Sequence, residues 1–176
     1  MISKVQQNRE KKIVREESVS YIRALRVFTM VGVLACASLA SARDLALVSN
    51  KANTVSAVTL PELVKVCKAQ TPRWPDGKPV TFVMLAPATP EMRSLMEKVY
   101  EMPESDVVSL ISSANHGRTN HPAILVANSE EDLVNKVSSI PGAVGVVDVY
   151  SINSSVTVMK VAGKLPLEPG YPLHGN

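Results

Sequence analysis

Apolar positions along this chain form short continuous runs and helical stripes, separated by clusters of turn-forming residues. Residues 44–50, 79–85 and 143–149 hold continuous apolar runs, which are typical of strands covered on both faces of a sheet. Gly145 interrupts the third of these runs. Residues 156–161 alternate between apolar and polar side chains, and this pattern predicts an edge strand.

Helical patterns separate these runs. A capping box at Thr59, with proline in the first turn, begins a helix that ends before Pro72. Two further helices are predicted over residues 103–111 and 129–140. Another helix begins at Thr89, and we interpret its apolar stripe as core packing rather than a methionine ligand site; the stripe consists of Met92, Leu95, Met96 and Val99.

Strands that alternate with helices predict βαβ units. We therefore expect an α/β fold, a three-layer lobe with a mostly parallel sheet flanked by helices, as one domain over residues 43–164. Residues 165–176 are rich in proline and glycine, which disfavour helix and strand. We expect this segment to be a flexible tail that trails from the domain.

Residues 23–42 have the pattern of an export signal. Two arginines precede an uncharged run of about 14 residues, and Ala40-Ser41-Ala42 is a small-x-small cleavage site. A membrane-spanning helix needs about 20 residues, so the run is too short for a permanent anchor. We expect residues 1–42 to be a signal peptide with an extended n-region, cleaved after Ala42, and the mature domain to be periplasmic or secreted. An uncleaved anchor and lipoprotein processing at Cys36 are the alternatives.

The predicted leader accounts for the net positive charge of the chain. Residues 1–42 hold seven basic and three acidic side chains, so the 19 basic and 16 acidic residues of the whole chain fall to 12 and 13 without them. A nearly neutral domain with 4% aromatic residues offers neither a basic surface nor rings for stacking on bases. We expect no nucleic-acid partner.

Of the two cysteines, Cys36 lies in the predicted leader, and Cys67 lies in an apolar helical pattern. An intrachain disulfide in the mature domain is therefore excluded, and we expect Cys67 to be a buried, inert thiol.

Four segments in order resemble the solute-binding proteins of phosphate ABC importers, which have the type 2 periplasmic binding fold. The segments are Leu45-Ala-Leu-Val-Ser-Asn-Lys51, Leu60-Pro-Glu-Leu63, Arg73-Trp-Pro-Asp-Gly77 and Ile140-Pro-Gly-Ala-Val-Gly-Val-Val-Asp148. The resemblance implies two α/β lobes that close on an anion, of which this chain resembles one lobe, the second, with strands like the two hinge crossings.

In that family, hydroxyls and backbone N–H groups hold phosphate at the start of the helix after the strand that corresponds to residues 80–85. Here Thr89 keeps a hydroxyl, while Pro87 and Pro90 each remove a backbone donor. The resemblance implies that Thr89 is an anion ligand. The alternative is that Thr89 acts only as a helix N-cap.

A second candidate is the polar loop over residues 115–121. His116, Arg118 and Thr119 lie in it, and His121 closes it. The two imidazoles and the guanidinium can bind an anionic ligand. The two histidines can also bind a metal together, although two histidines at this spacing are a weak metal signature. The alternative is an ordinary solvated loop. We assign no metal site and no cofactor.

No pattern of nucleophile, base or paired acids indicates catalysis, and we expect no enzyme. The first hypothesis is an exported solute-binding lobe for phosphate or another small oxyanion, with an ABC permease as partner. Because one lobe cannot close over a ligand alone, a homodimer is a further possible partner. The second hypothesis is a non-transporting module that binds another envelope protein and keeps a degenerate ligand site.

Overall fold

The computed structural model of this chain describes residues 44–118 and 120–174. The predicted signal peptide, its cleavage after Ala42 and the alternative lipid site at Cys36 fall on residues outside this part. Thr119 of the candidate loop also falls outside it.

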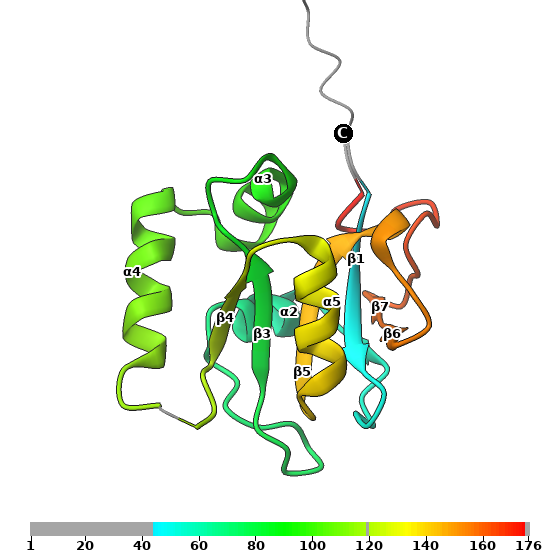
Figure 1. Ribbon diagram of the computed structural model, residues 1–176. Coiled ribbons are helices and arrows are strands. Elements are labelled where there is room, and N and C mark those ends of the chain that lie inside the picture. Colours follow the sequence, from blue (N-terminus) through cyan, green and yellow to red (C-terminus); the bar gives the residue numbers. More distant parts are fainter. Residues whose placement is uncertain (1–43, 119, 175–176) are drawn as a thin grey trace, which may run out of the picture. The chain divides into compact units, whose positions relative to one another are not determined.

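A five-stranded sheet in the order β4-β3-β5-β1-β6 forms the centre of the described domain (Figure 1). Strand β3 pairs in parallel with β4 and β5, and β1 pairs antiparallel with β5 and β6. Four of the five strands therefore run in one direction, which confirms the mostly parallel sheet. The strands are β1 (Leu45–Asn50), β3 (Thr81–Leu85), β4 (Ile124–Ala127), β5 (Ala143–Asp148) and β6 (Val156–Val158).

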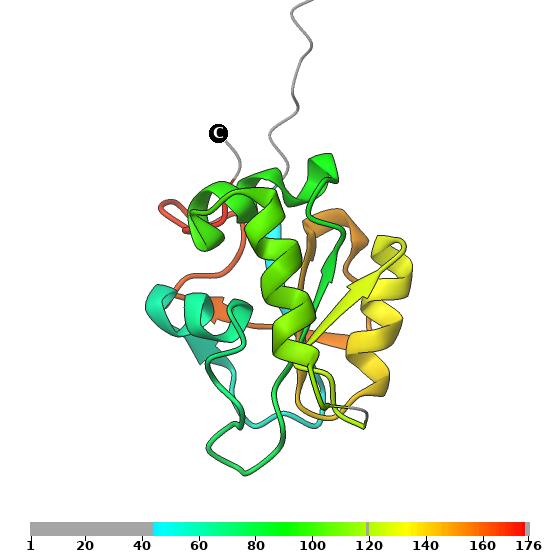
Figure 2. The ribbon, with the colours of Figure 1, turned by 90° about the vertical axis from the view of Figure 1, so that its left-hand side faces the viewer.

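Helices cover both faces of this sheet and complete the expected three layers. Helix α5 lies on one face and α2 on the other, while α4 runs beside the β4 edge (Figures 1 and 2). No helix among the described residues is both long and apolar enough to span a membrane. The helical elements are α2 (Leu60–Cys67), η2 (Pro90–Met92), α3 (Arg93–Leu95), η3 (Met96–Tyr100), α4 (Glu104–Asn115), α5 (Glu130–Ser139) and η4 (Val149–Ser151).

The helix predicted from Thr89 is less regular than expected. It consists of a 3-10 turn (η2), a short α-helical segment (α3) and a π-helical turn (η3), and Glu101 follows η3 in the left-handed conformation. Its apolar stripe nevertheless packs against the core: Met92, Leu95 and Val99 are buried as predicted, whereas Met96 is only partly buried. The stripe was predictable because it depends on burial, whereas the type of helical turn depends on tertiary packing.

Gly145 does not interrupt β5. A Cβ atom at this position would lie 2.7 Å from Leu133 Cδ2 and 2.9 Å from the carbonyl oxygen of Val83. The absence of a side chain therefore lets α5 approach the centre of the sheet, which explains a glycine inside a buried strand.

The predicted edge strand over residues 156–161 is divided between two sheets. Strand β6 pairs with β1, and β7 (Lys160–Val161) pairs in parallel with β2 (Ala57–Val58). Between them, Met159 is fully buried and its N–H donates to the carbonyl oxygen of Leu47. The chain turns at Met159 because this side chain enters the core.

The expectation that the C-terminal segment trails is wrong for its described residues. The segment has no helix or strand, but Tyr171 and Leu173 are buried. Strand β6 pairs only with the second half of β1, so the first half needs other acceptors. The N–H of Leu45 donates to the Leu173 carbonyl at 3.3 Å, and the N–H of Leu47 donates to the Tyr171 hydroxyl at 3.3 Å. The segment therefore continues the domain beyond residue 164.

Candidate functional site

The carboxyl ends of β3, β4 and β5 lie at one edge of the sheet, because these strands are mutually parallel. In open α/β sheets, ligands bind in the crevice outside this edge. The turn from β3 into η2, the N-terminus of α5 after β4, and η4 after β5 all meet there. This edge is therefore where a ligand site is expected.

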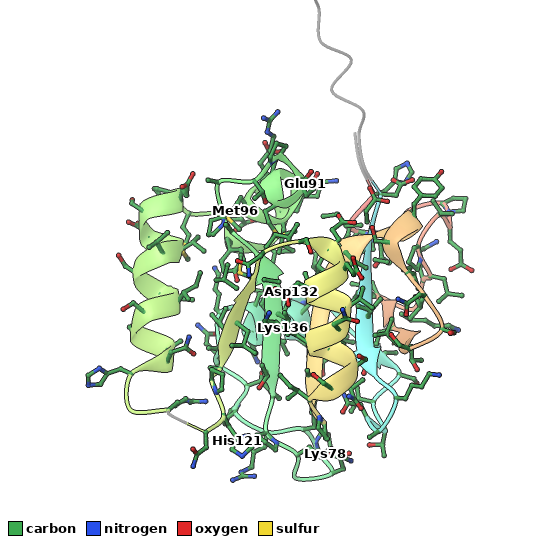
Figure 3. The ribbon with its side chains drawn as sticks, viewed as in Figure 1. Lys78, Glu91, Met96, His121, Asp132 and Lys136 are labelled. Atoms are coloured by element: carbon green, nitrogen blue, oxygen red, sulfur yellow. The ribbon has the colours of Figure 1, made fainter. Side chains whose placement is uncertain are left out.

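A pocket of about 330 Å³ lies at the carboxyl end of β3. Its lining comes from the β3–η2 turn, from α3 and η3, and from the first turn of α4; it consists of residues 87–90, Arg93, Met96, Glu97 and Glu104. Figure 3 labels Met96 at this end of the sheet. The volume falls within the range of sites for small molecules. We call it the β3 pocket.

Thr89 lines the β3 pocket, as the resemblance implies for a ligand residue. It occupies the N-cap position of η2, but its side chain makes no cap hydrogen bond, so a purely capping role is wrong. The hydroxyl instead donates to the carbonyl oxygen of Ala86 at 2.8 Å. Because this bond uses the only proton of the hydroxyl, the oxygen is left with lone pairs that can accept a hydrogen bond.

Three charged side chains line the same pocket: Arg93, Glu97 and Glu104. Their side chains form no ion pair with any other described residue. The sequence did not lead us to predict Arg93 as a site residue. Its spacing was a usable signal, because it follows Thr89 by four residues and so lies about one helical turn further along the chain. The pocket thus combines one cation with two anions.

The polar loop lies at the other end of the sheet. It precedes β4, whereas Thr89 follows β3, and the two strands are parallel. Figure 3 labels His121 at the end of the sheet opposite Met96. The structure therefore does not bring Arg118 or His116 together with Thr89 in one site.

Within the loop, Asn115 has a structural role. Its amide donates to the carbonyl oxygen of Ile124 at 2.7 Å, and its Oδ1 accepts from the N–H groups of Ala123 and Ile124. These bonds fix the start of β4. His116 and Arg118 are exposed, and His116 borders a shallow hollow on α4 with Val108 and three serines.

Carboxylates occupy the edge near α5. Ser129 caps this helix by accepting from the N–H of Asp132 at 3.1 Å. Glu130 accepts from the N–H of Asp148 and from the hydroxyl of Ser151. Hydrogen bonds from the Lys136 ammonium and then from the Asn128 N–H lower the pKa of Asp132. Acidic side chains therefore gather near α5, whereas the lining of the β3 pocket includes the cation Arg93.

Cys67 is fully buried, and burial raises the pKa of its thiol far above the ordinary value. The prediction of a buried, inert thiol is thus confirmed. Among residues 44–118 and 120–174, no group of three or more His, Cys, Asp or Glu side chains is arranged to hold a metal ion.

Solved structures of other proteins share this fold, and three of them illustrate the likeness. The ABC-type phosphate transport receptor from Vibrio cholerae is 20% identical with a TM-score of 0.62, and the match covers 77% of this chain and 55% of the receptor. PstS from Borrelia burgdorferi is 13% identical with a TM-score of 0.57, covering 76% of this chain and 55% of PstS. The phosphate-binding protein from Stenotrophomonas maltophilia is 17% identical with a TM-score of 0.53, covering 71% of this chain and 40% of that protein.

No protein-family model and no curated protein matches the sequence. The likeness is one of fold, and at that level the resemblance inferred from the sequence is confirmed. The match spans about half of the length of the Vibrio and Borrelia proteins. All three structures are of binding proteins rather than enzymes.

Proposed function

We propose that this chain is an exported, single-lobe relative of the phosphate ABC transporter substrate-binding proteins, and that it binds a small solute with an anionic group in the β3 pocket. The observation that supports this most is the position of Thr89 and Arg93 in one pocket at the carboxyl end of β3. This is the edge of an α/β sheet at which ligands bind.

Arg93 is the group proposed to hold the anion. A guanidinium presents a planar fork of N–H donors that matches two oxygens of a carboxylate or a phosphate. The side chain is exposed and has no ion-pair partner among the described residues, so it can turn toward a ligand without breaking an existing contact.

The pocket lies at the surface of a single lobe. Typical sites bury most of the surface of their ligand, and the lining of the β3 pocket comes from this one lobe. We propose that a second copy of the chain or a partner protein of the envelope covers the bound solute. Delivery to an ABC permease is the transport role that this arrangement supports.

The test is thermal unfolding of protein produced from the full chain, with millimolar phosphate, sulfate or a small carboxylate at equal ionic strength. A ligand at 100 times its dissociation constant stabilises the fold by about 2.7 kcal/mol, which raises the Tm by several degrees. We expect a shift with an anionic solute that Arg93→Gln abolishes and Arg118→Gln leaves in place. A shift that Arg118→Gln abolishes and Arg93→Gln leaves in place would instead indicate an anion site in the loop over residues 115–121.

The second candidate is a non-transporting module that binds another envelope protein. The two prolines of the β3–η2 turn, which lack the backbone donors that hold phosphate, favour it. If no anionic solute shifts the Tm of the native chain, this candidate replaces the first.

A further inference from the structure

We propose that the ligand of the β3 pocket carries an ammonium group as well as an anionic group, and that inorganic phosphate is a poor ligand. This inference rests on the proposed function, because it assigns a chemical class to the solute of the same pocket. It follows from the charges, the hydrogen bonds and the missing donors of the lining.

The charges of the lining do not suit a bare anion. Arg93 supplies one positive charge, while Glu97 and Glu104 supply two negative ones. Phosphate at neutral pH would gain one favourable contact and face two carboxylates. A solute with both charges satisfies the guanidinium at one end and the carboxylates at the other.

The polar atoms of the β3–η2 turn also favour a ligand that donates. The proton of the Thr89 hydroxyl is bound to the carbonyl oxygen of Ala86, so in this arrangement Thr89 accepts rather than donates. Pro87 and Pro90 have no N–H. An ammonium group supplies three donors for such acceptors, and phosphate at neutral pH is chiefly an acceptor.

The charged side chains of the lining come from neighbouring helical elements. Arg93 and Glu97 are four residues apart on consecutive helical turns, and Glu104 comes from the first turn of α4. Met96, which is partly buried, lines the pocket with them and offers an apolar surface for the carbon atoms of a ligand. The three charged side chains thus come from three successive elements, Arg93 from α3, Glu97 from η3 and Glu104 from α4.

The experiment compares matched pairs of ligands by calorimetry on protein from the full chain. Phosphoethanolamine and ethyl phosphate differ by the ammonium group, as do glycine and acetate, and inorganic phosphate is the fifth probe. We expect at least one ammonium-bearing probe to bind about tenfold more tightly than its partner, because two carboxylates contribute. Phosphate should bind more weakly than that probe.

Substitutions in the lining test which side chains cause the preference for an ammonium group. Glu97→Gln with Glu104→Gln should remove the preference for the ammonium-bearing probe and strengthen phosphate binding, while Arg93→Gln should weaken every probe. Glu131→Gln is the matched control, since Glu131 is also an exposed acid in the first turn of a helix. This control should retain the preference.

The outcomes separate the two proposals. If the partners of each pair bind equally and Arg93→Gln weakens both, the inference about the ammonium is overturned and the proposed function stands. If the preference persists in the Glu97 and Glu104 double variant, the inference is also overturned. If none of the five probes binds, both proposals fail.

Discussion

The backbone N–H of Leu47 in β1 donates to the phenolic oxygen of Tyr171, 124 residues further along the chain, at 3.3 Å. Tyr171 is itself buried, and with Leu173 it packs the C-terminal segment against the domain. We expect Tyr171→Phe to lower the free energy of unfolding by about 1–3 kcal/mol, because the buried N–H loses its acceptor. Denaturant unfolding measures this change.

The control is Tyr150→Phe, since Tyr150 is 92% exposed. Its unfolding free energy should stay within about 0.5 kcal/mol of the native value, as for most surface changes. Equal stability of the Tyr171 variant would mean that the C-terminal segment does not hold its place in solution.

Alkaline pH provides a second prediction. Burial raises the pKa of Tyr171 to about 12, and burial also raises the pKa of Tyr100. A tyrosine in the unfolded chain titrates near pH 10, so above this pH the unfolded chain loses protons that the folded chain keeps. The stability contribution is complete below about pH 10 and falls as the pH rises toward about 12.

Urea unfolding at a series of pH values between about 8 and 12 measures this dependence. The slope should be shallower in Tyr171→Phe, because one of the two buried phenols is removed. An unchanged slope in this variant would contradict the burial of Tyr171.

Gly145→Ala tests the close approach of α5 to β5. The added methyl group would lie 2.7 Å from Leu133 Cδ2 on α5 and 2.9 Å from the backbone carbonyl oxygen of Val83 on β3, so the packing between α5 and the sheet must adjust. We expect a loss of about 1–3 kcal/mol of unfolding free energy, as for other overpacked cores. Thermal or denaturant unfolding measures it.

Gly117→Ala separates this clash from backbone strain. Gly117 has a positive φ of 72°, but a Cβ atom there meets nothing within 4 Å. Its cost should be limited to strain, about 1 kcal/mol. A larger loss at Gly117 than at Gly145 would refute the packing argument.

Asn50 supports the end of α5. Its amide donates to the carbonyl oxygens of Val137 at 2.9 Å and Ser138 at 2.8 Å, and its Oδ1 accepts from the N–H of Ala52. Asn50→Asp replaces both donors with an acceptor and places a carboxylate against two carbonyl groups. We expect a loss of about 2–4 kcal/mol in unfolding free energy at neutral pH.

The loss from Asn50→Asp should shrink at acid pH, where a protonated carboxyl group regains one donor. Chemical unfolding at pH about 7 and about 4 compares the two conditions. A loss that is the same at both values would show that the charge at residue 50 is not the cause.

The parts of the fold that were predictable are those fixed by local chemistry or by burial on two faces. Strands β1 and β3 are buried along their whole length, which gives each a continuous apolar run. The capping box at Thr59 was predictable because its partner is three residues away: Glu62 accepts from the N–H of Thr59 at 2.7 Å.

Long-range pairing was not predictable. The role of Tyr171 depends on a strand 124 residues earlier, and strands β2 and β7 are too short to give an alternating pattern. Asn50 was interpreted only as the end of a strand, since nothing near it in sequence indicates that α5 ends against it.

The residues of the candidate site also divide into those that local sequence indicates and those that depend on long-range packing. Thr89 was identified through the family resemblance, which points to the start of the helix after a recognisable strand, whereas Glu104 joins the pocket only through the position at which α4 begins. The separation of Arg118 from Thr89 could have been inferred: one precedes a strand, the other follows a parallel neighbour, and the two ends of parallel strands lie apart.

The C-terminal segment also places the two ends of the described domain together, since His174 Nδ1 lies 2.8 Å from Asp44 Oδ1. A domain whose ends adjoin can be inserted into a loop of another protein, or circularly permuted, with only a short linker. A second lobe or another domain can therefore be joined to this one near residues 44 and 174 without disturbing the rest of the domain.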